Sequence, residues 1–370
     1  MFPRRPIVTS ACLAAAMLAL TVPTAAVEEA NYARVNASLA AHHIAPRYWR
    51  LATAAKAFDR TVTELCRAAP PRDLAPARAA FNGAMDAWMD IEHIHHGPVE
   101  LFMRKFRIHY WPDKGSRGAR QIRQLLARKD AAVLSPDDFR AASVAVQGLP
   151  TAERLLFTEP SAGAIAAGTD GDYPCRLLGA ISFNIADMAG GLDADWSGGT
   201  RSFVKELQNP GGGDARYEDH GAVTAEFVKG LNTSLITIAD LKLDAVLGKT
   251  LKEAMPRRSE SWRSGRSLRN IVRDIGAIRA MYEGEGGPGL KALLPASKSA
   301  LADLLSRAFD QILATARTID APLARAVADP AKRPAVERLA KEIRALKQLV
   351  GGRLATALGT PLGFNALDGD

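Results

Sequence analysis

The stretch EEANYARVNASLAAHHIAPRYWRLATAAKAFDRTVTELCRA, residues 28–68, decides the fold class. It is rich in alanine, the strongest helix former, and its single proline, Pro46, marks the junction expected between two helices. Helical signals of the same kind follow along the rest of the chain. No segment shows the convincing alternation at period two that a half-buried strand would give. We therefore predict an all-α fold.

Length and composition suggest two bundles. The chain has 370 residues, enough for two domains, with 47% hydrophobic and 24% charged residues, both ordinary for a folded globular protein. Segments rich in proline and glycine gather mid-chain at 159–172, 190–199 and 209–214. We place a boundary near 195–215 and predict two helical bundles packed side by side, at residues 27–205 and 206–370.

The first residues have the pattern of an export signal. Arg4 and Arg5 precede an apolar stretch too short to span a bilayer, and small residues up to Ala26 suit cleavage. We predict a signal peptide over residues 1–26, a periplasmic location and no transmembrane segment in the mature chain. Removal of the two arginines lowers the net charge from +8 to +6. Because the basic residues form no long run, we predict no nucleic-acid binding.

Two cysteines, Cys66 and Cys175, remain after the predicted cleavage. An even count in an oxidising compartment favours a disulfide. The alternative is two separate buried thiols.

Four of the seven histidines fall between residues 93 and 109. We expect a helix from about Asp73 to about His96, and on such a helix Trp88, Glu92 and His96 share one face. Glutamate and histidine at this spacing could ligate one metal ion. The alternative is a solvated helix end, where histidine also suits the dipole.

A cluster of arginines lies at residues 257–274. Arg266, Arg269 and Arg273 share a face of a helix expected over 264–283, which Ser264 could cap. Arginine is suited to bidentate contact with carboxylates. These residues are either surface charge, or they meet Glu92 and Glu153, or an anionic ligand, in a cleft.

The stretch VQGLPTAERLLF, residues 146–157, has the apolar pattern of a helix but contains Pro150. A helix interior disfavours proline, so the position of Pro150 needs an explanation. If the chain breaks at Leu149, Pro150 occupies the first turn of a new helix, where its missing N–H costs little. Glu153 then lies near free backbone N–H groups. Either the acid only complements the helix dipole, or the break directs it into a cleft between helices.

Together these stretches resemble the imelysin-like family of exported bacterial proteins. The named motif of that family, Gly-x-His-x-x-Glu, reads here Gly148-Leu149-Pro150-Thr151-Ala152-Glu153, with proline in place of histidine. The other matching positions are Trp88, Glu92, Gly97–Val99, Phe106–Arg107, Trp111–Asp113, Ser259–Ser267 and Gly363–Asp370. The resemblance implies an all-α fold of two helical bundles and a role linked to bacterial iron acquisition.

Some members of the family are classed as peptidases on this motif. Because Pro150 offers no metal ligand, we expect this chain not to be an enzyme but a binding or accessory component of iron uptake. Its partner would be a periplasmic or membrane iron-uptake protein. Its ligand cleft would be lined by Trp88, Glu92, Arg107, Trp111, Gly148, Glu153, Ser264, Arg266 and Ser267.

Two alternatives stay open at this point. One is a metal-dependent peptidase, with iron or zinc held by Glu92, His96 and Glu153. The other is a structural, partner-binding helical protein. The geometry of the acids and histidines discriminates between them, because a metal site needs two or three ligands that converge.

Overall fold

The structure is a computed structural model, and it describes residues 28–199, 202–212 and 216–360. Helices make up its regular structure, and these residues include no strand, so the predicted all-α fold is confirmed. The predicted signal peptide and the matching stretch Gly363–Asp370 lie outside the described residues. No helix in the described part is both long and apolar enough to cross a membrane.

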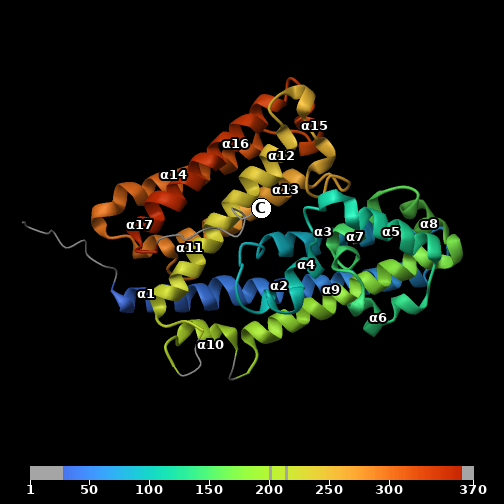
Figure 1. Cartoon of the computed structure of the whole chain (residues 1–370), viewed down its shortest axis with the longest axis horizontal. Coiled ribbons are helices and arrows are strands. Elements are labelled where there is room, and N and C mark those ends of the chain that lie inside the picture. The colour runs from blue at the N-terminus through green and yellow to red at the C-terminus, as the bar shows by residue number, and fades with distance from the viewer. Residues whose placement is uncertain (1–27, 200–201, 213–215, 361–370) are drawn as a thin grey trace, which may run out of the picture.

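The first half of the chain is built on two long helices. The helices are α1 Glu29–Ser38, α2 Ala45–Arg67, α3 Ala75–Met89, α4 Arg104–Ile108, α5 Arg117–Arg128, α6 Pro136–Ala141, α7 Leu149–Phe157, α8 Ser161–Ala167 and α9 Tyr173–Ser197. The long helices α2 and α9 run side by side along one layer, and the short helices α5 to α8 gather toward one end of it (Figure 1).

Side-chain contacts along their length hold α2 and α9 together. The Ser182 hydroxyl donates to Asp59 Oδ1 at 2.8 Å, and Tyr48 stacks on Trp196 with ring centroids 5.1 Å apart. At the other end, Cys66 and Cys175 form a disulfide, which confirms the predicted pairing. The bond closes a long loop, because 109 positions separate the two cysteines, and such a loop restricts the unfolded chain strongly.

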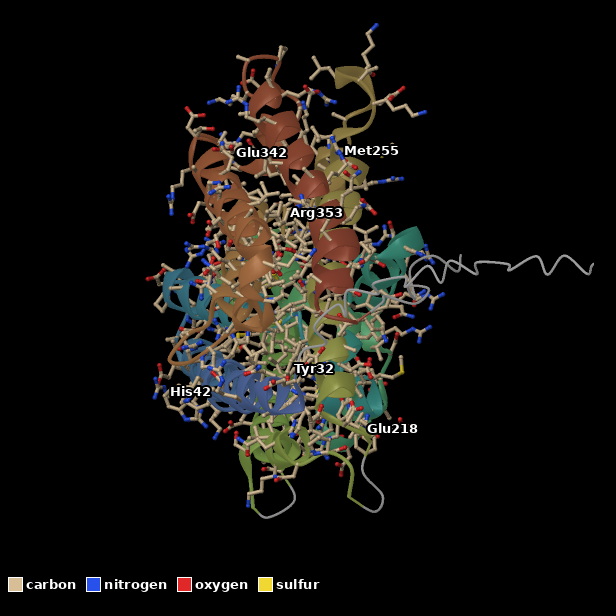
Figure 2. The ribbon with its side chains drawn as sticks, turned by 90° about the vertical axis from the view of Figure 1, so that its left-hand side faces the viewer. Tyr32, His42, Glu218, Met255, Glu342 and Arg353 are labelled. Carbon is tan, nitrogen blue, oxygen red and sulfur yellow. A yellow bond between two sulfur atoms is a disulfide. The ribbon has the colours of Figure 1, made fainter. Side chains whose placement is uncertain are left out.

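The second half of the chain begins with α10 Phe203–Gln208, which lies below α1 and α2 in Figure 1. Most of the later helices form another group above the first. They are α11 His220–Ile236, α12 Ala245–Leu247, α13 Ser267–Glu283, α14 Ser299–Arg317, α15 Leu323–Ala326, α16 Arg333–Gln348 and α17 Ala355–Ala357. The two ends of the described chain meet, because the hydroxyl of Tyr32, labelled in Figure 2, donates to the Leu358 carbonyl at 2.6 Å. The predicted boundary at residue 205 stays a prediction.

Three wide helical turns interrupt the long helices. These π-helical segments are η1 Leu39–Ile44, η8 Thr237–Asp244 and η13 Leu349–Leu354. The sequence predicted a helix pair across residues 28–68, and η1 joins α1 to α2 there without a break in helical conformation. Segments of this kind occur often at functional sites, and η8 carries the buried Lys242.

Tight turns connect the helices. The short 3₁₀ segments are η2 Gly97–Val99, η3 Leu101–Met103, η4 Lys114–Ser116, η5 Ala132–Leu134, η6 Val144–Val146, η7 Asp170–Asp172, η9 Leu251–Glu253, η10 Pro256–Arg258, η11 Leu290–Leu293 and η12 Ala296–Lys298. Ser135 caps α6 as its sequence suggests, because its side chain accepts from the Asp138 backbone N–H. The helix is short and ends at Ala141.

Candidate functional site

Gly148 brings two of the expected site segments together. A Cβ at this position would lie 2.2 Å from the Ile108 carbonyl oxygen and 2.5 Å from that of Arg107, so only glycine allows this approach. Pro150 sits in the first turn of α7, where its missing N–H is tolerated. The break therefore starts a helix with Glu153 on it, next to the segment that carries His109 and Trp111.

Glu153 is buried and bound by a residue from the second half of the chain. Its Oε1 accepts hydrogen bonds from the backbone N–H and the hydroxyl of Ser264, each at 2.8 Å. Arg263 Nη1 lies 4.0 Å from Oε2. Burial raises the pKa of Glu153, and the two bonds from Ser264 oppose this rise only in part. Ser264 therefore contacts Glu153 and does not cap α13, whose first residue is Ser267.

Lys242 is the centre of a buried cluster of charges. Its Nζ lies 2.7 Å from Asp274 Oδ2, 2.8 Å from Glu92 Oε2 and 3.0 Å from Glu260 Oε2. Lys242 and Glu260 are each only 1% exposed. An unpaired charge at such depth would cost several kcal/mol, roughly, so these four side chains hold each other in place.

The cluster shifts the pKa values of its members in opposite directions. Burial would lower the pKa of Lys242, but Asp274, Glu260 and Glu92 outweigh it and raise the value well above normal. Burial would raise the pKa of Glu92, but the Lys242 ammonium and His109 hold it well below its usual range. Burial raises the pKa of Asp274 well above normal. The arrangement keeps the ammonium charged and Glu92 ionised.

Arg266 lies beside this cluster but binds a different acid. Its guanidinium donates to Asp86 Oδ1 at 2.5 Å, to Asn82 Oδ1 at 2.8 Å and to Asn270 Oδ1 at 2.8 Å. Asn270 in turn donates to Glu260 Oε2 at 2.8 Å. Arg269 also pairs with Asp86, and Arg273 pairs with Asp90. The cation that pairs with Glu92 is therefore Lys242 and not an arginine. The three arginines pair instead with Asp86 on α3 and with Asp90 in the turn after it.

Four further residues of the expected cleft each have different surroundings. Trp88 is buried, with its ring centroid 6.1 Å from that of His109. The Trp111 ring faces Lys242, with 5.9 Å between its centroid and Nζ. Arg107 donates to Gln147 Oε1 at 2.7 Å and to Asn184 Oδ1 at 3.2 Å. Ser267 is buried, and its hydroxyl has no hydrogen-bond partner.

A cleft of about 620 Å³ opens beside Glu153 and His109. Trp111 and Trp262 contribute aromatic rings to its wall, and Arg263 and Arg257 lie over the Trp262 ring at 4.5 Å and 5.7 Å from its centroid. Its basic residues are Lys114, Arg154, Arg257, Arg258 and Arg263, and its acidic residues are Asp113 and Glu153. The lining therefore carries an excess of positive charge.

The imelysin family model matches residues 44–350, which include all of these site residues. The chain belongs to the imelysin family. It is 24% identical over 303 residues to iron-regulated protein A of Synechococcus elongatus, covering 79% of this chain and 77% of that protein.

Two crystal structures share the fold. An imelysin-like protein from Psychrobacter arcticum superimposes with a TM-score of 0.70 at 18% identity, over 92% of this chain and 99% of the other. A protein described as an iron-regulated protein A precursor, from Parabacteroides distasonis, gives a TM-score of 0.71 at 17% identity, over 88% and 95%.

The imelysin motif of this chain does not fit a metal ion. Pro150 has no side chain that could ligate, and the Glu153 oxygen nearest Ser264 already accepts two hydrogen bonds. A His/Glu centre of the peptidase type therefore lacks half of its ligands at this position.

The expected helix face with Trp88, Glu92 and His96 is wrong. Helix α3 ends at Met89, and Glu92 lies in the turn that follows. His96 lies beyond this turn and is extended where it precedes Gly97, and Gly97, the residue before Pro98, has a positive φ of 75° that no helix continues through. The His96 ring packs among Trp196, Phe203 and Phe227, and burial lowers its pKa to about 3.

Sequence reasoning missed three residues of the buried cluster, Lys242, Glu260 and Asp274, and also His109, which lies beside Glu92 and Glu260. His109 was counted among the clustered histidines without a role, and Glu260 stood within the matching stretch Ser259–Ser267. Lys242 had a usable signal, since it is a lone lysine between Leu241 and Leu243 in a largely apolar stretch. Such a lysine is rarely buried unless it is paired.

Proposed function

We propose that this imelysin-like chain is an exported, non-catalytic binding component of bacterial iron acquisition. Relatives named iron-regulated protein A support the link with iron. The pattern of residues 1–26 supports export to the periplasm. The loss of the motif histidine at Pro150 argues against peptidase activity.

The ligand in this proposal is an anion. The observation that carries it is the cleft lining, in which five basic residues face two acidic ones. Both acids are already engaged, because Asp113 accepts from the Gly118 and Ala119 backbone N–H groups and Glu153 accepts from Ser264. Arginine binds carboxylates through paired hydrogen bonds, so a ferric ion chelated by carboxylates matches the cleft in charge and chemistry.

Titration of the mature chain with ferric citrate tests the proposal. The readout is tryptophan fluorescence, because Trp111 and Trp262 line the cleft. We expect saturable binding that weakens as salt is raised, and at least a tenfold loss of affinity, roughly, when Arg257 and Arg258 are both changed to Ala. Both side chains are exposed, so the variant should fold normally.

Arg317→Ala serves as the matched control, because this arginine is also exposed but does not line the cleft. It should bind ferric citrate like the parent. The proposal fails if the parent does not bind ferric citrate, or if the double variant and the control bind equally well.

A further inference from the structure

The His109 ring lies between two carboxylates, and a neutral imidazole can donate a hydrogen bond to only one of them. Its Nδ1 lies 3.3 Å from Glu92 Oε1, and its Nε2 lies 3.7 Å from Glu260 Oε1. A neutral imidazole carries one N–H and one lone pair. When Nδ1 donates to Glu92, the lone pair of Nε2 faces the Glu260 oxygen with no hydrogen between them.

Glu260 presents an unused oxygen at this point. Its Oε2 is bound by Lys242 and by Asn270, whereas its Oε1 is buried and has no hydrogen-bond partner. A buried carboxylate oxygen without a donor is costly. In addition, Glu92 and Glu260 share the ammonium of Lys242 through one oxygen each, so the Glu260 oxygen that faces His109 is left without a hydrogen-bond donor.

We propose that Glu92, His109 and Glu260 bind a divalent transition-metal ion. One ligand atom from each residue lies within 4.8 Å of the others, and two carboxylates with one imidazole suit Zn²⁺, Fe²⁺ or Mn²⁺. Lys242 holds the second oxygen of each glutamate and so fixes both carboxylates without occupying the side near His109. The ion reaches the site through the cleft, because His109 belongs to its lining.

This site is separate from the position of the family motif. Neither Pro150 nor Glu153 contributes a ligand, and the ion would sit against residues from the turn after α3, the end of α4 and the segment before α13. It also does not depend on the anion-binding role of the cleft.

Metal titration of the tag-free mature chain, stripped with EDTA and dialysed, tests the proposal. We measure Zn²⁺ binding by calorimetry and thermal shift, and Co²⁺ binding by visible absorption. We expect one ion per chain and a raised melting temperature. His109→Asn and Glu260→Gln should each weaken binding at least tenfold, roughly, as the loss of groups around a metal does.

The control variants are His96→Asn and Glu153→Gln, which change a buried histidine and a buried glutamate outside the proposed set. Both should bind the ion like the parent. The proposal is overturned if the parent binds no ion at millimolar concentration, or if binding survives both ligand changes.

If the ligand variants do not fold, X-ray absorption of the Zn²⁺-loaded parent decides. One imidazole with oxygen neighbours supports the site, and a shell with several imidazoles or none refutes it. Because ferric citrate binding can be measured on the Arg257/Arg258 variant and zinc binding on His109→Asn, the two proposals can fail independently.

Discussion

Ser264 donates two hydrogen bonds to a single oxygen of Glu153, from its backbone N–H and from its hydroxyl, each 2.8 Å long. The two residues are 111 positions apart, so this contact ties α7 to the segment before α13. Glu153 is 2% exposed, and a buried carboxylate needs such donors to remain in place. In this chain the acid of the family motif therefore has a structural partner.

Replacing Ser264 with alanine should destabilise the protein by about 1–3 kcal/mol, because a buried carboxylate loses one of its two donors. Urea denaturation at pH 7 measures the change. The control is Ser259→Ala, because Ser259 is also buried but its hydroxyl has no partner; we expect a loss of under about 1 kcal/mol. Equal midpoints for the two variants would contradict the structural role of the contact.

Arg266→Ala should lower the free energy of unfolding by about 3–5 kcal/mol, the usual cost of breaking a buried ion pair from one side. Arg266 is 4% exposed and binds Asp86, Asn82 and Asn270. Arg269 also binds Asp86, but its side chain is 58% exposed. We expect Arg269→Ala to cost under about 1 kcal/mol. Parent-like denaturation midpoints in both variants would show that Arg266 acts as surface charge.

The stability that Asp86 contributes should disappear in acid. Burial raises the pKa of Asp86, but Arg269 and Arg266 outweigh it and lower the value below the ordinary 3.8. A carboxyl with a lowered pKa in the folded state stabilises above its unfolded pKa and loses this effect as pH falls through the folded value. The stability difference between the parent and Asp86→Asn should be constant from about pH 5 to 7 and shrink below about pH 4. If the stability difference between the two proteins does not change with pH, the pKa of Asp86 is not lowered by its arginine partners.

We expect no metal-dependent proteolysis of casein by the mature chain, because the imelysin motif has proline at position 150 and its Glu153 is held by Ser264. The assay includes added Zn²⁺, since an empty site would otherwise explain inactivity. Cleavage that is lost on EDTA treatment and absent from Glu153→Gln would show that the motif is active without its histidine.

Removal of the disulfide by Cys66→Ser with Cys175→Ser should cost about 4–5 kcal/mol if the bond acts by restricting the unfolded chain. The estimate follows from the 109 positions between the two cysteines. Thiol titration of the unfolded, unreduced mature chain should find no free thiol. Two titratable thiols, or unchanged stability in the double variant, would contradict this expectation.

The sequence by itself determined the all-helical fold and the family, and it favoured the disulfide that the structure confirms. These properties depend on local or compositional features: alanine content, the missing alternation of strands, an even number of cysteines after the predicted cleavage, and short motifs such as Gly148 to Glu153. The motif alone singles out Gly148, but only the structure explains why glycine is needed there. A Cβ at this position would lie within 2.5 Å of the Arg107 and Ile108 carbonyl oxygens.

Only the tertiary structure decided which charged residues meet. Glu92 was expected on a helix with His96, but α3 ends at Met89 and the turn directs Glu92 to Lys242, which lies 150 positions further along the chain. Asp86 forms an ion pair with Arg266, and Glu260 lies within 4 Å of both Lys242 and His109. A buried charge is stable only beside a partner, whatever the sequence separation of the two. Helix ends and the packing of distant helices set those partners, and neither follows from local sequence patterns.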